Sequence, residues 1–365
     1  MNNSSHPCIT RFSILTIIFW IALAGCAGPQ APAPAALTSI QAPDQSSDWP
    51  TEGWKTSPPE EQGLDAARLA QMQAAIQQQN LSLHSLLIVR HGYLVSETYY
   101  PPYKQDTRHE LYSCTKSFIA TLIGIAIDKG FIGGIDQPVL GFFPEYSFDD
   151  PGGLREAIKL EHLLTMTSGL DWQEGDPVYR QMYLSEDWVS FVLETPMAVQ
   201  PGTRFNYCSG CSHILSAIIQ RATRMPTQTF AEEYLFEPLG ISGDDWHTDA
   251  AGMPIGGWGL QLTPRDMAKL GYLYLHQGQW DGQQIVPAEW VQAATQKHTA
   301  TESELGYGYQ WWTYPKYGAY AALGRDGQTI FVIPEMDMIV VTTAASGGHE
   351  QIFQLIDEYI VPAAH

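Results

Sequence analysis

Strand-like sequence is confined to the two ends of this chain, with a long helical stretch between them. The segments with alternating or β-branched composition are 84–89, 93–99, 319–323, 329–333 and 338–343. The first two flank the two-residue turn His91-Gly92, which predicts a hairpin. Because the intervening region, from Ser117 to about Gly278, reads as mostly helical, we expect one antiparallel sheet assembled from both chain ends, with the helical region inserted. This is an α/β (α+β) fold.

Helical periodicity sets the remaining elements. The helices predicted by apolar spacing are 65–79, 117–129, 159–166, 212–223, 227–235, 264–277 and 350–359. We therefore expect one folded body over 53–365. Its α/β part comprises about 53–116 and 300–365, and its helical part about 117–299.

The composition limits the function. Hydrophobic residues make up 44% of the chain and charged residues 16%, which allows a large core and excludes a disordered chain. The 39 acidic and 19 basic residues give a net charge of −20. Because nucleic acid and anionic lipid surfaces repel such a chain, neither is expected as a partner.

The N-terminus reads as a targeting segment. An apolar run from Phe12 to about Ala24 follows Arg11 and is too short to span a bilayer comfortably. It ends in Leu23-Ala24-Gly25-Cys26, which resembles a bacterial lipoprotein signal. We expect a signal peptide over 1–25 and a lipid anchor on Cys26. The alternatives are an ordinary signal peptide with a chance cysteine and a single-pass anchor.

The segment that follows is rich in Pro and Ala. Residues 26–52 read as a semi-extended tether, because such a composition cannot bury enough surface to fold. Ala27 gives no inner-membrane retention cue of the aspartate type. We therefore expect an exported lipoprotein that faces the periplasm, with the outer membrane favoured.

Ser113-Cys114-Thr115-Lys116 is a candidate nucleophile motif at the start of an apolar helix. Side chains three residues apart on a helix share a face, so the Lys116 amine can reach the Ser113 hydroxyl. Burial lowers the pKa of a lysine, which can then accept the serine proton. A helix start also favours an oxyanion. The alternative is a capping serine followed by a lysine whose amine extends to solvent.

Tyr207 is a second candidate, because it precedes a predicted helix on a loop. A phenol beside a buried amine can share or relay the serine proton. Buried tyrosines are more often hydrogen-bonded core residues, and only the surrounding motifs favour the catalytic interpretation.

Six stretches of the chain together resemble a known superfamily. They are Ser113–Phe118, Gly124–Gly130, His162–Leu170, Pro201-Gly202-Thr203, Tyr207-Cys208-Ser209 and Gly327-Gln328. The chain resembles the serine hydrolases that include class C β-lactamases, DD-peptidases and related esterases, in particular the 6-aminohexanoate-dimer hydrolase branch. The resemblance implies an α/β domain and an all-helical domain with the site between them.

The same resemblance implies roles for individual residues. Ser113 is the acylated nucleophile, Lys116 the general base, and Tyr207 the proton relay and leaving-group acid. Ser209 binds the substrate or Lys116. No cofactor or metal is implied.

The sequence departs from the penicillin-recognising members in one respect. The strand expected to line the site, within residues 320–328, lacks Lys-Thr-Gly, whose cation meets the substrate carboxylate. A backbone N–H there, from Ala322 or Gly324, can still serve as the second oxyanion donor. Arg325 either replaces the missing cation or is a solvated loop residue beside Asp326. The second interpretation is favoured.

Several other residues are weighed against ordinary structural roles. We expect Cys208 and Cys211 to be small buried thiols, with a disulfide as the second choice and a redox or zinc site disfavoured. No histidine is assigned to catalysis. The tyrosine motif argues against Glu174 as a water-activating glutamate. Among the aromatic residues, Trp172 and Trp258 are expected to line the cleft.

These observations favour a serine hydrolase that cleaves an ester or linear amide of a small molecule. The first alternative is a β-lactamase or DD-peptidase. The second is a non-catalytic protein that binds cell-envelope fragments. The sequence leaves the oligomeric state open.

Overall fold

The computed structural model describes residues 49–150, 152–346 and 348–365. The expected signal peptide, Cys26 and almost all of the expected tether lie outside these residues. Within them, no helix combines the length and the apolar character needed to cross a bilayer.

An eight-stranded antiparallel sheet has the strand order β2-β1-β12-β11-β10-β9-β8-β7. Its strands are β1 (Leu83–Arg90), β2 (Tyr93–Tyr99), β7 (Thr299–Ala300), β8 (Gly306–Tyr307), β9 (Trp312–Tyr314), β10 (Ala319–Gly324), β11 (Gln328–Ile333) and β12 (Met338–Ala344). Because β1 pairs with β12, the N-terminal hairpin and the C-terminal strands join in one sheet, with β1 second and β12 third in the order. The predicted fold class is confirmed. The short strands β7, β8 and β9 were not predicted.

The remaining strands form two small pairs. They are β3 (His109–Glu110) with β4 (Gln261–Leu262), and β5 (Gln279–Trp280) with β6 (Gln283–Gln284). Strand β3 lies just before the candidate nucleophile in the chain, and β4 comes from the segment just before α9 (Pro264–Leu275).

Both faces of the sheet are buried. On β1, Leu86 and Ile88 join one apolar cluster, whereas Leu87 and Val89 join the other. Successive side chains of a strand point to opposite faces, so a strand buried on both sides reads as a continuous apolar run.

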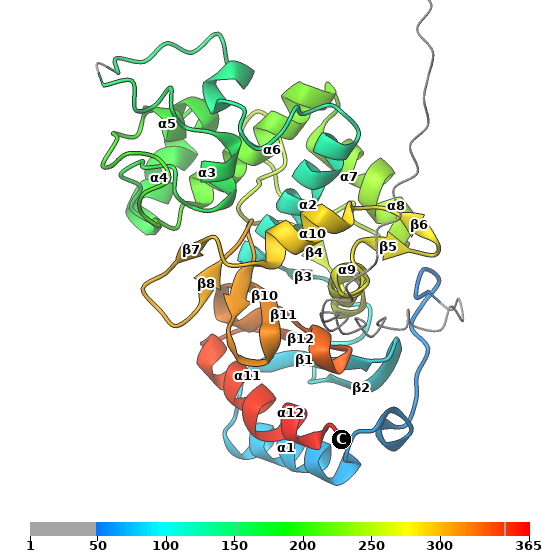
Figure 1. The fold of residues 1–365 in the computed structure, drawn as a ribbon. Coiled ribbons are helices and arrows are strands. Elements are labelled where there is room, and N and C mark those ends of the chain that lie inside the picture. The colour runs from blue at the N-terminus through cyan, green and yellow to red at the C-terminus, as the bar shows by residue number, and fades with distance from the viewer. Residues whose placement is uncertain (1–48, 151, 347) are drawn as a thin grey trace, which may run out of the picture. The chain divides into compact units, whose positions relative to one another are not determined.

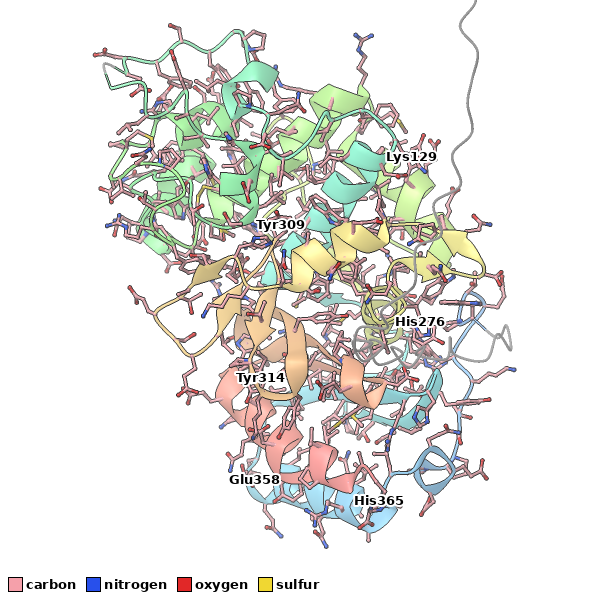
Figure 2. All side chains as sticks on the ribbon, viewed as in Figure 1. Lys129, His276, Tyr309, Tyr314, Glu358 and His365 are labelled. Atoms are coloured by element: carbon pink, nitrogen blue, oxygen red, sulfur yellow. A yellow bond between two sulfur atoms is a disulfide. The ribbon has the colours of Figure 1, made fainter. Side chains whose placement is uncertain are left out.

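One face of the sheet is covered by the two ends of the described chain. The covering helices are α1 (Ala66–Gln78), α11 (His349–Leu355), the π-helical turn η8 (Ile356–Ile360) and α12 (Val361–Ala363). Figure 1 shows α1, α11 and α12 together on this side. Tyr314 of β9, labelled in Figure 2, packs against Phe353 of α11, with ring centroids 5.2 Å apart.

The opposite face is covered by α9 (Pro264–Leu275), which packs against β1, β11 and β12 (Figure 1). Gly271 permits this approach, because a Cβ there would lie 2.9 Å from Ile339. The sequence placed α9 in the helical part of 117–299. The structure corrects this, because the helix buries its apolar face on the sheet. Periodicity predicts a helix but not its partner.

The other helices form the helical part above the sheet (Figure 1). They are α2 (Thr115–Asp128), α3 (Leu160–Leu164), α4 (Asp176–Leu184), α5 (Trp188–Glu194), α6 (Ser209–Thr223), α7 (Thr227–Ala231) with the π-helical turn η4 (Glu232–Phe236), α8 (Glu237–Leu239) and α10 (Ala288–Thr295). Helix α2 is buried from Thr115 to Ala126 and packs against α6. The first turns of α2 and α6 carry the candidate site.

Candidate active site

Ser113 lies in η2 (Tyr112–Cys114), a short 3-10 turn that runs directly into α2. Tyr112 adopts a left-handed backbone conformation, with φ of 46°, which turns the chain into the helix. The end of β10 lies against this turn: a Cβ on Gly324 would be 2.2 Å from the Leu111 carbonyl oxygen. Glycine is therefore required at 324 for the strand to approach the candidate nucleophile.

Lys116 is buried below Ser113 and makes three polar contacts. Its Nζ lies 2.9 Å from Ser113 Oγ, 3.0 Å from Ser209 Oγ and 2.7 Å from the carbonyl oxygen of Gly257. Burial lowers the pKa of Lys116 to about 8, although the charge of Glu174 opposes the shift. An amine with this pKa is partly neutral near neutral pH and can accept the serine proton.

Tyr207 lies beside these two residues. Its ring centroid is 4.9 Å from Lys116 Nζ and 5.8 Å from the ring centroid of Trp312, on which it stacks. Burial raises the pKa of Tyr207 above its usual range, against a hydrogen bond with Ser113 that lowers it. The phenol is therefore neutral at physiological pH and able to donate a proton.

Cys114, next to the nucleophile, has a structural position. Its thiol is buried and donates to the Gln328 carbonyl oxygen of β11 at 3.4 Å. Burial raises the pKa of Cys114 well above its usual value, so the thiol is not a reactive nucleophile.

A cleft of about 660 Å³ opens above Ser113. Its aromatic and apolar wall comprises Tyr112, Tyr179, Tyr183, Tyr207, Trp258, Leu305, Trp312, Leu323 and Phe353. Its polar wall comprises Glu110, Ser113, Glu174, Asp176, Ser209, His247, Ser303, Arg325 and His349, with Gly324 at the end of β10. A pocket of this size and mixed lining suits a small organic substrate.

The structure brings most of the sequence-predicted residues together. Ser113, Tyr207, Ser209, Trp258 and Gly324 line the cleft, and Lys116 lies directly beneath it. Two predicted substrate-binding residues do not line it. Ala322 is buried within β10 and does not line the cleft, whereas Gly324 at the end of the same strand does.

Trp172 is the second correction. It is almost fully buried, and its ring packs against Gly210 of α6, where a Cβ would be 2.7 Å from the ring. Its indole N–H donates to Glu174 at 2.5 Å. Trp172 thus supports the start of α6 from behind the cleft, a position that a loop aromatic in the sequence does not reveal.

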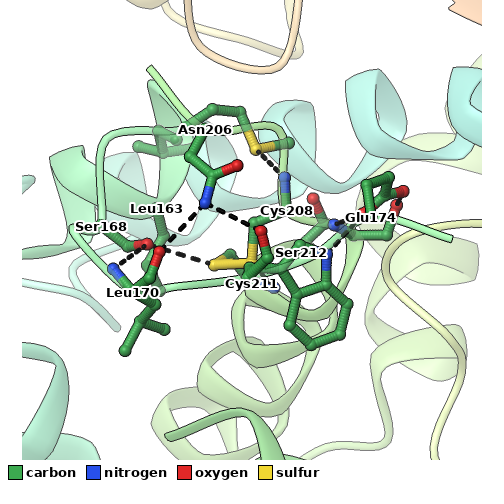
Figure 3. Close-up of a disulfide and its surroundings, with 12 residues drawn as sticks. Leu163, Ser168, Leu170, Glu174, Asn206, Cys208, Cys211 and Ser212 are labelled. Atoms are coloured by element: carbon green, nitrogen blue, oxygen red, sulfur yellow. Dashed lines mark hydrogen bonds between the residues drawn. A yellow bond between two sulfur atoms is a disulfide. The ribbon is translucent and has the colours of Figure 1, made fainter. Parts of the chain in front are cut away.

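The structure also corrects the expectation of free thiols at Cys208 and Cys211, which form a disulfide (Figure 3). In the first turn of a helix, residues three apart share a face. The Cα atoms are 5.2 Å apart, within the range of a disulfide. The bond closes a short loop that contains Ser209, and Tyr207 lies immediately before this loop in the chain.

Sequence reasoning did not name Glu110, assigned no catalytic role to His247, and favoured a position in solvent for Arg325; all three line the cleft. Arg325, interpreted as a solvated loop residue, is exposed but lines the cleft, with its guanidinium 5.6 Å from the Tyr112 ring. Glu110 is half-buried nearby, and burial raises its pKa against the opposing charges of His247 and Arg325. These residues lie far apart in the chain, and no spacing pattern joins them.

Glu174, which the tyrosine motif disfavours as a water-activating glutamate, lies on the cleft wall within hydrogen-bond distance of Ser209. It lies on the loop before α4, and Figure 3 shows it beside the first turn of α6. Only the long-range packing of that loop on α6 brings its carboxylate to the site.

The fold and the site together define a hydrolase that uses a serine nucleophile. The family model described as Beta-lactamase matches residues 66–364, and the chain belongs to this family.

Two curated proteins show the range of its relatives. The chain is 26% identical over 283 residues to the 6-aminohexanoate-dimer hydrolase of Paenarthrobacter ureafaciens, covering 70% of this chain and 71% of that protein. It is 28% identical over 204 residues to Esterase EstB of Burkholderia gladioli, covering 49% of this chain and 52% of that protein.

Solved structures share the fold. A penicillin-binding protein homologue from Caulobacter crescentus superimposes with a TM-score of 0.65 at 19% identity, covering 82% of this chain and 98% of that one.

The lowered pKa of Lys116 predicts the pH dependence of acylation. Only the neutral amine can accept the Ser113 proton, so kcat/KM should rise as the pH increases and level off above an apparent pKa of about 8. Because Lys116 and Tyr207 are coupled, this value belongs to the pair. The measurement is kcat/KM for an aryl ester against pH. A value of kcat/KM that falls as the pH increases toward this apparent pKa would contradict a lysine base.

Proposed function

We propose that this serine hydrolase opens an ester or a linear amide bond through an acyl-enzyme on Ser113. The observation that carries the proposal is the 2.9 Å contact between Ser113 Oγ and the buried Lys116 amine. Two relatives support the bond types. One is named 6-aminohexanoate-dimer hydrolase, and an amide bond joins two amino acids in a linear dimer; the other is named an esterase.

In the first step, neutral Lys116 takes the Ser113 proton while the serine oxygen attacks the substrate carbonyl. The oxyanion is stabilised by the backbone N–H of Ser113, at the positive start of α2, and by the backbone near Gly324. Tyr207 gives a proton to the leaving alcohol or amine and regains one from Lys116. Water then attacks the acyl-enzyme, with the same base and acid in reverse roles.

A second candidate, a β-lactamase or DD-peptidase, has one observation in its favour. Arg325 lines the cleft and offers a cation to a substrate carboxylate, in place of the absent Lys-Thr-Gly lysine. The acidic Glu110, Glu174 and Asp176 line the same cleft and disfavour an anionic substrate.

A matched substrate panel tests the function. Aryl esters and anilides of graded acyl length, with a chromogenic cephalosporin beside them, are assayed with the wild type and Ser113→Ala. The proposal predicts ester or anilide turnover that Ser113→Ala abolishes. Rapid cephalosporin turnover with inert esters and anilides would favour the second candidate. A wild type no more active than Ser113→Ala on every compound would indicate a binding protein.

We also propose that the chain is exported and anchored by lipid on Cys26, facing the periplasm from the outer membrane. The support is the sequence Leu23-Ala24-Gly25-Cys26, with Ala27 in place of an aspartate retention cue. Cells fed a clickable palmitate should yield labelled wild type and unlabelled Cys26→Ser. Equal labelling, or labelled protein in the inner-membrane fraction, would contradict the anchor or its location.

A further inference from the structure

Four hydrogen-bond donors converge on the carboxylate of Glu174. Its Oε1 accepts from the Ser209 hydroxyl at 2.5 Å and from the Tyr179 phenol. Its Oε2 accepts from the Trp172 indole N–H at 2.5 Å and from the Ser209 backbone N–H at 3.1 Å. The cleft side of Glu174 is exposed, but its two oxygens are held against the start of α6.

These contacts fix the direction of the hydrogen bonds around Lys116. An ionised carboxylate only accepts, so the Ser209 hydroxyl must donate its proton to Glu174. The Ser209 oxygen is then left to accept from Lys116 Nζ, 3.0 Å away. The Gly257 carbonyl oxygen, 2.7 Å from the same Nζ, can also only accept.

The consequence appears when Lys116 is neutral. A neutral amine has two N–H bonds and one lone pair. If the two N–H bonds are directed to Ser209 and Gly257, the lone pair is left facing the third neighbour, Ser113 Oγ, at 2.9 Å. This is the orientation in which the amine can take the serine proton.

We propose that Glu174 is a positioning residue that sets this polarity: by holding the Ser209 proton, it aims the Lys116 lone pair at Ser113. The inference rests on the proposed serine hydrolase function and deepens it. Glu174 acts through Ser209 and performs no proton transfer to the substrate.

The variant Glu174→Gln should reverse the polarity. The two N–H donors, on Trp172 and on the Ser209 backbone, cannot become acceptors, so they require the amide oxygen on their side. The amide NH₂ then faces the Ser209 hydroxyl and donates to it. The Ser209 proton turns toward Lys116 and occupies the lone pair that Ser113 needs.

The variant should also change the protonation of Lys116. The titratable side chains facing it are Cys114 on η2, Tyr207 before α6 and Glu174 before α4. Of these three, Glu174 carries the charge, because burial raises the pKa of both Cys114 and Tyr207. That charge raises the pKa of Lys116 against burial. Removing that charge should lower the pKa of Lys116, so the rise of the acylation rate with pH should occur at lower pH.

The experiment measures the second-order rate of Ser113 labelling by a fluorophosphonate against pH, with the full chain. At high pH, where the labelling rate has levelled off, Glu174→Gln should label at least about tenfold more slowly than the wild type. The rise of its labelling rate with pH should occur at lower pH than in the wild type. Glu174→Asp keeps the charge and the acceptor character. Its labelling rate should therefore rise over the same pH range as that of the wild type, and it should label faster than Glu174→Gln. Asp171→Asn removes a charge from the same loop, where Asp171 is exposed and bonded to Gln173, and should behave as the wild type.

A double-variant comparison separates positioning from general damage. Because the effect passes through Ser209, adding Glu174→Gln to Ser209→Ala should change the plateau rate by less than about twofold. The inference would be overturned if the losses of labelling rate in the two single variants multiplied in the double variant. It would also be overturned if the labelling rate of Glu174→Gln rose over the same pH range as that of the wild type. A wild type that does not label at all would instead reject the proposed function, and the inference with it.

Discussion

Replacing Lys116 with Met should lower the rate of Ser113 acylation by roughly 10²- to 10⁴-fold, the contribution of a positioned general base. Methionine fills a similar volume but cannot accept the Ser113 proton. The fold should survive, because two effects on the free energy of unfolding oppose each other. The variant removes a buried amine, which is costly to desolvate, but it leaves the Gly257 carbonyl without that donor.

Lys269→Met is the matched control. Lys269 is also buried, and it lies 3.2 Å from the Asp266 carboxylate on α9, away from the cleft. Its loss leaves the carboxylate without that cation and should lower the melting temperature, yet leave Ser113 labelling unchanged. Labelling rates and melting curves of both variants make the test. If Lys116→Met labelled as fast as Lys269→Met, Lys116 would not be the base.

Tyr207→Phe should slow the hydrolysis of substrates with poor leaving groups by about 10²-fold or more. The variant keeps the ring that stacks on Trp312 and faces Lys116, and removes only the hydroxyl. Because the phenol protonates the departing group, an alkyl ester or amide should suffer more than an activated aryl ester, whose leaving group needs no proton.

The measurement is the ratio of kcat/KM for an alkyl ester to that for an aryl ester with the same acyl group. Tyr307→Phe is the control, since Tyr307 is a buried neighbour whose ring centroid lies 6.2 Å from that of Tyr207. This control should leave the ratio as it is. An equal loss on both esters in Tyr207→Phe would mean that Tyr207 has no role as leaving-group acid.

Local features of the fold could be predicted from the sequence. The hairpin of β1 and β2 and the long helices α2 and α6 follow from periodicity over neighbouring residues. The pairing of Ser113 with Lys116 is local as well, because one helical turn brings them together. For the same reason the spacing of Cys208 and Cys211 permitted a disulfide, but spacing alone did not decide between the bond and two thiols.

Features set by distant packing could not be predicted. Strands β7, β8 and β9 are only two or three residues long, too short to show a period of two. Helix α9 gave a clear helical pattern, but nothing in that pattern distinguishes a sheet from a helix as its partner. Glu174 reaches Ser209 only because its loop packs on α6, and Trp172 is buried by the same contact.

The central claim is that Ser113 carries the acyl group, and the mass of the peptide containing residue 113 tests it most directly. After brief reaction with a fluorophosphonate, or with an aryl ester quenched in acid, the account predicts one adduct on Ser113. The adduct should be absent from Ser113→Ala and slow to form in Lys116→Met. An adduct on any other residue, or equal labelling of Ser113→Ala, would contradict the account.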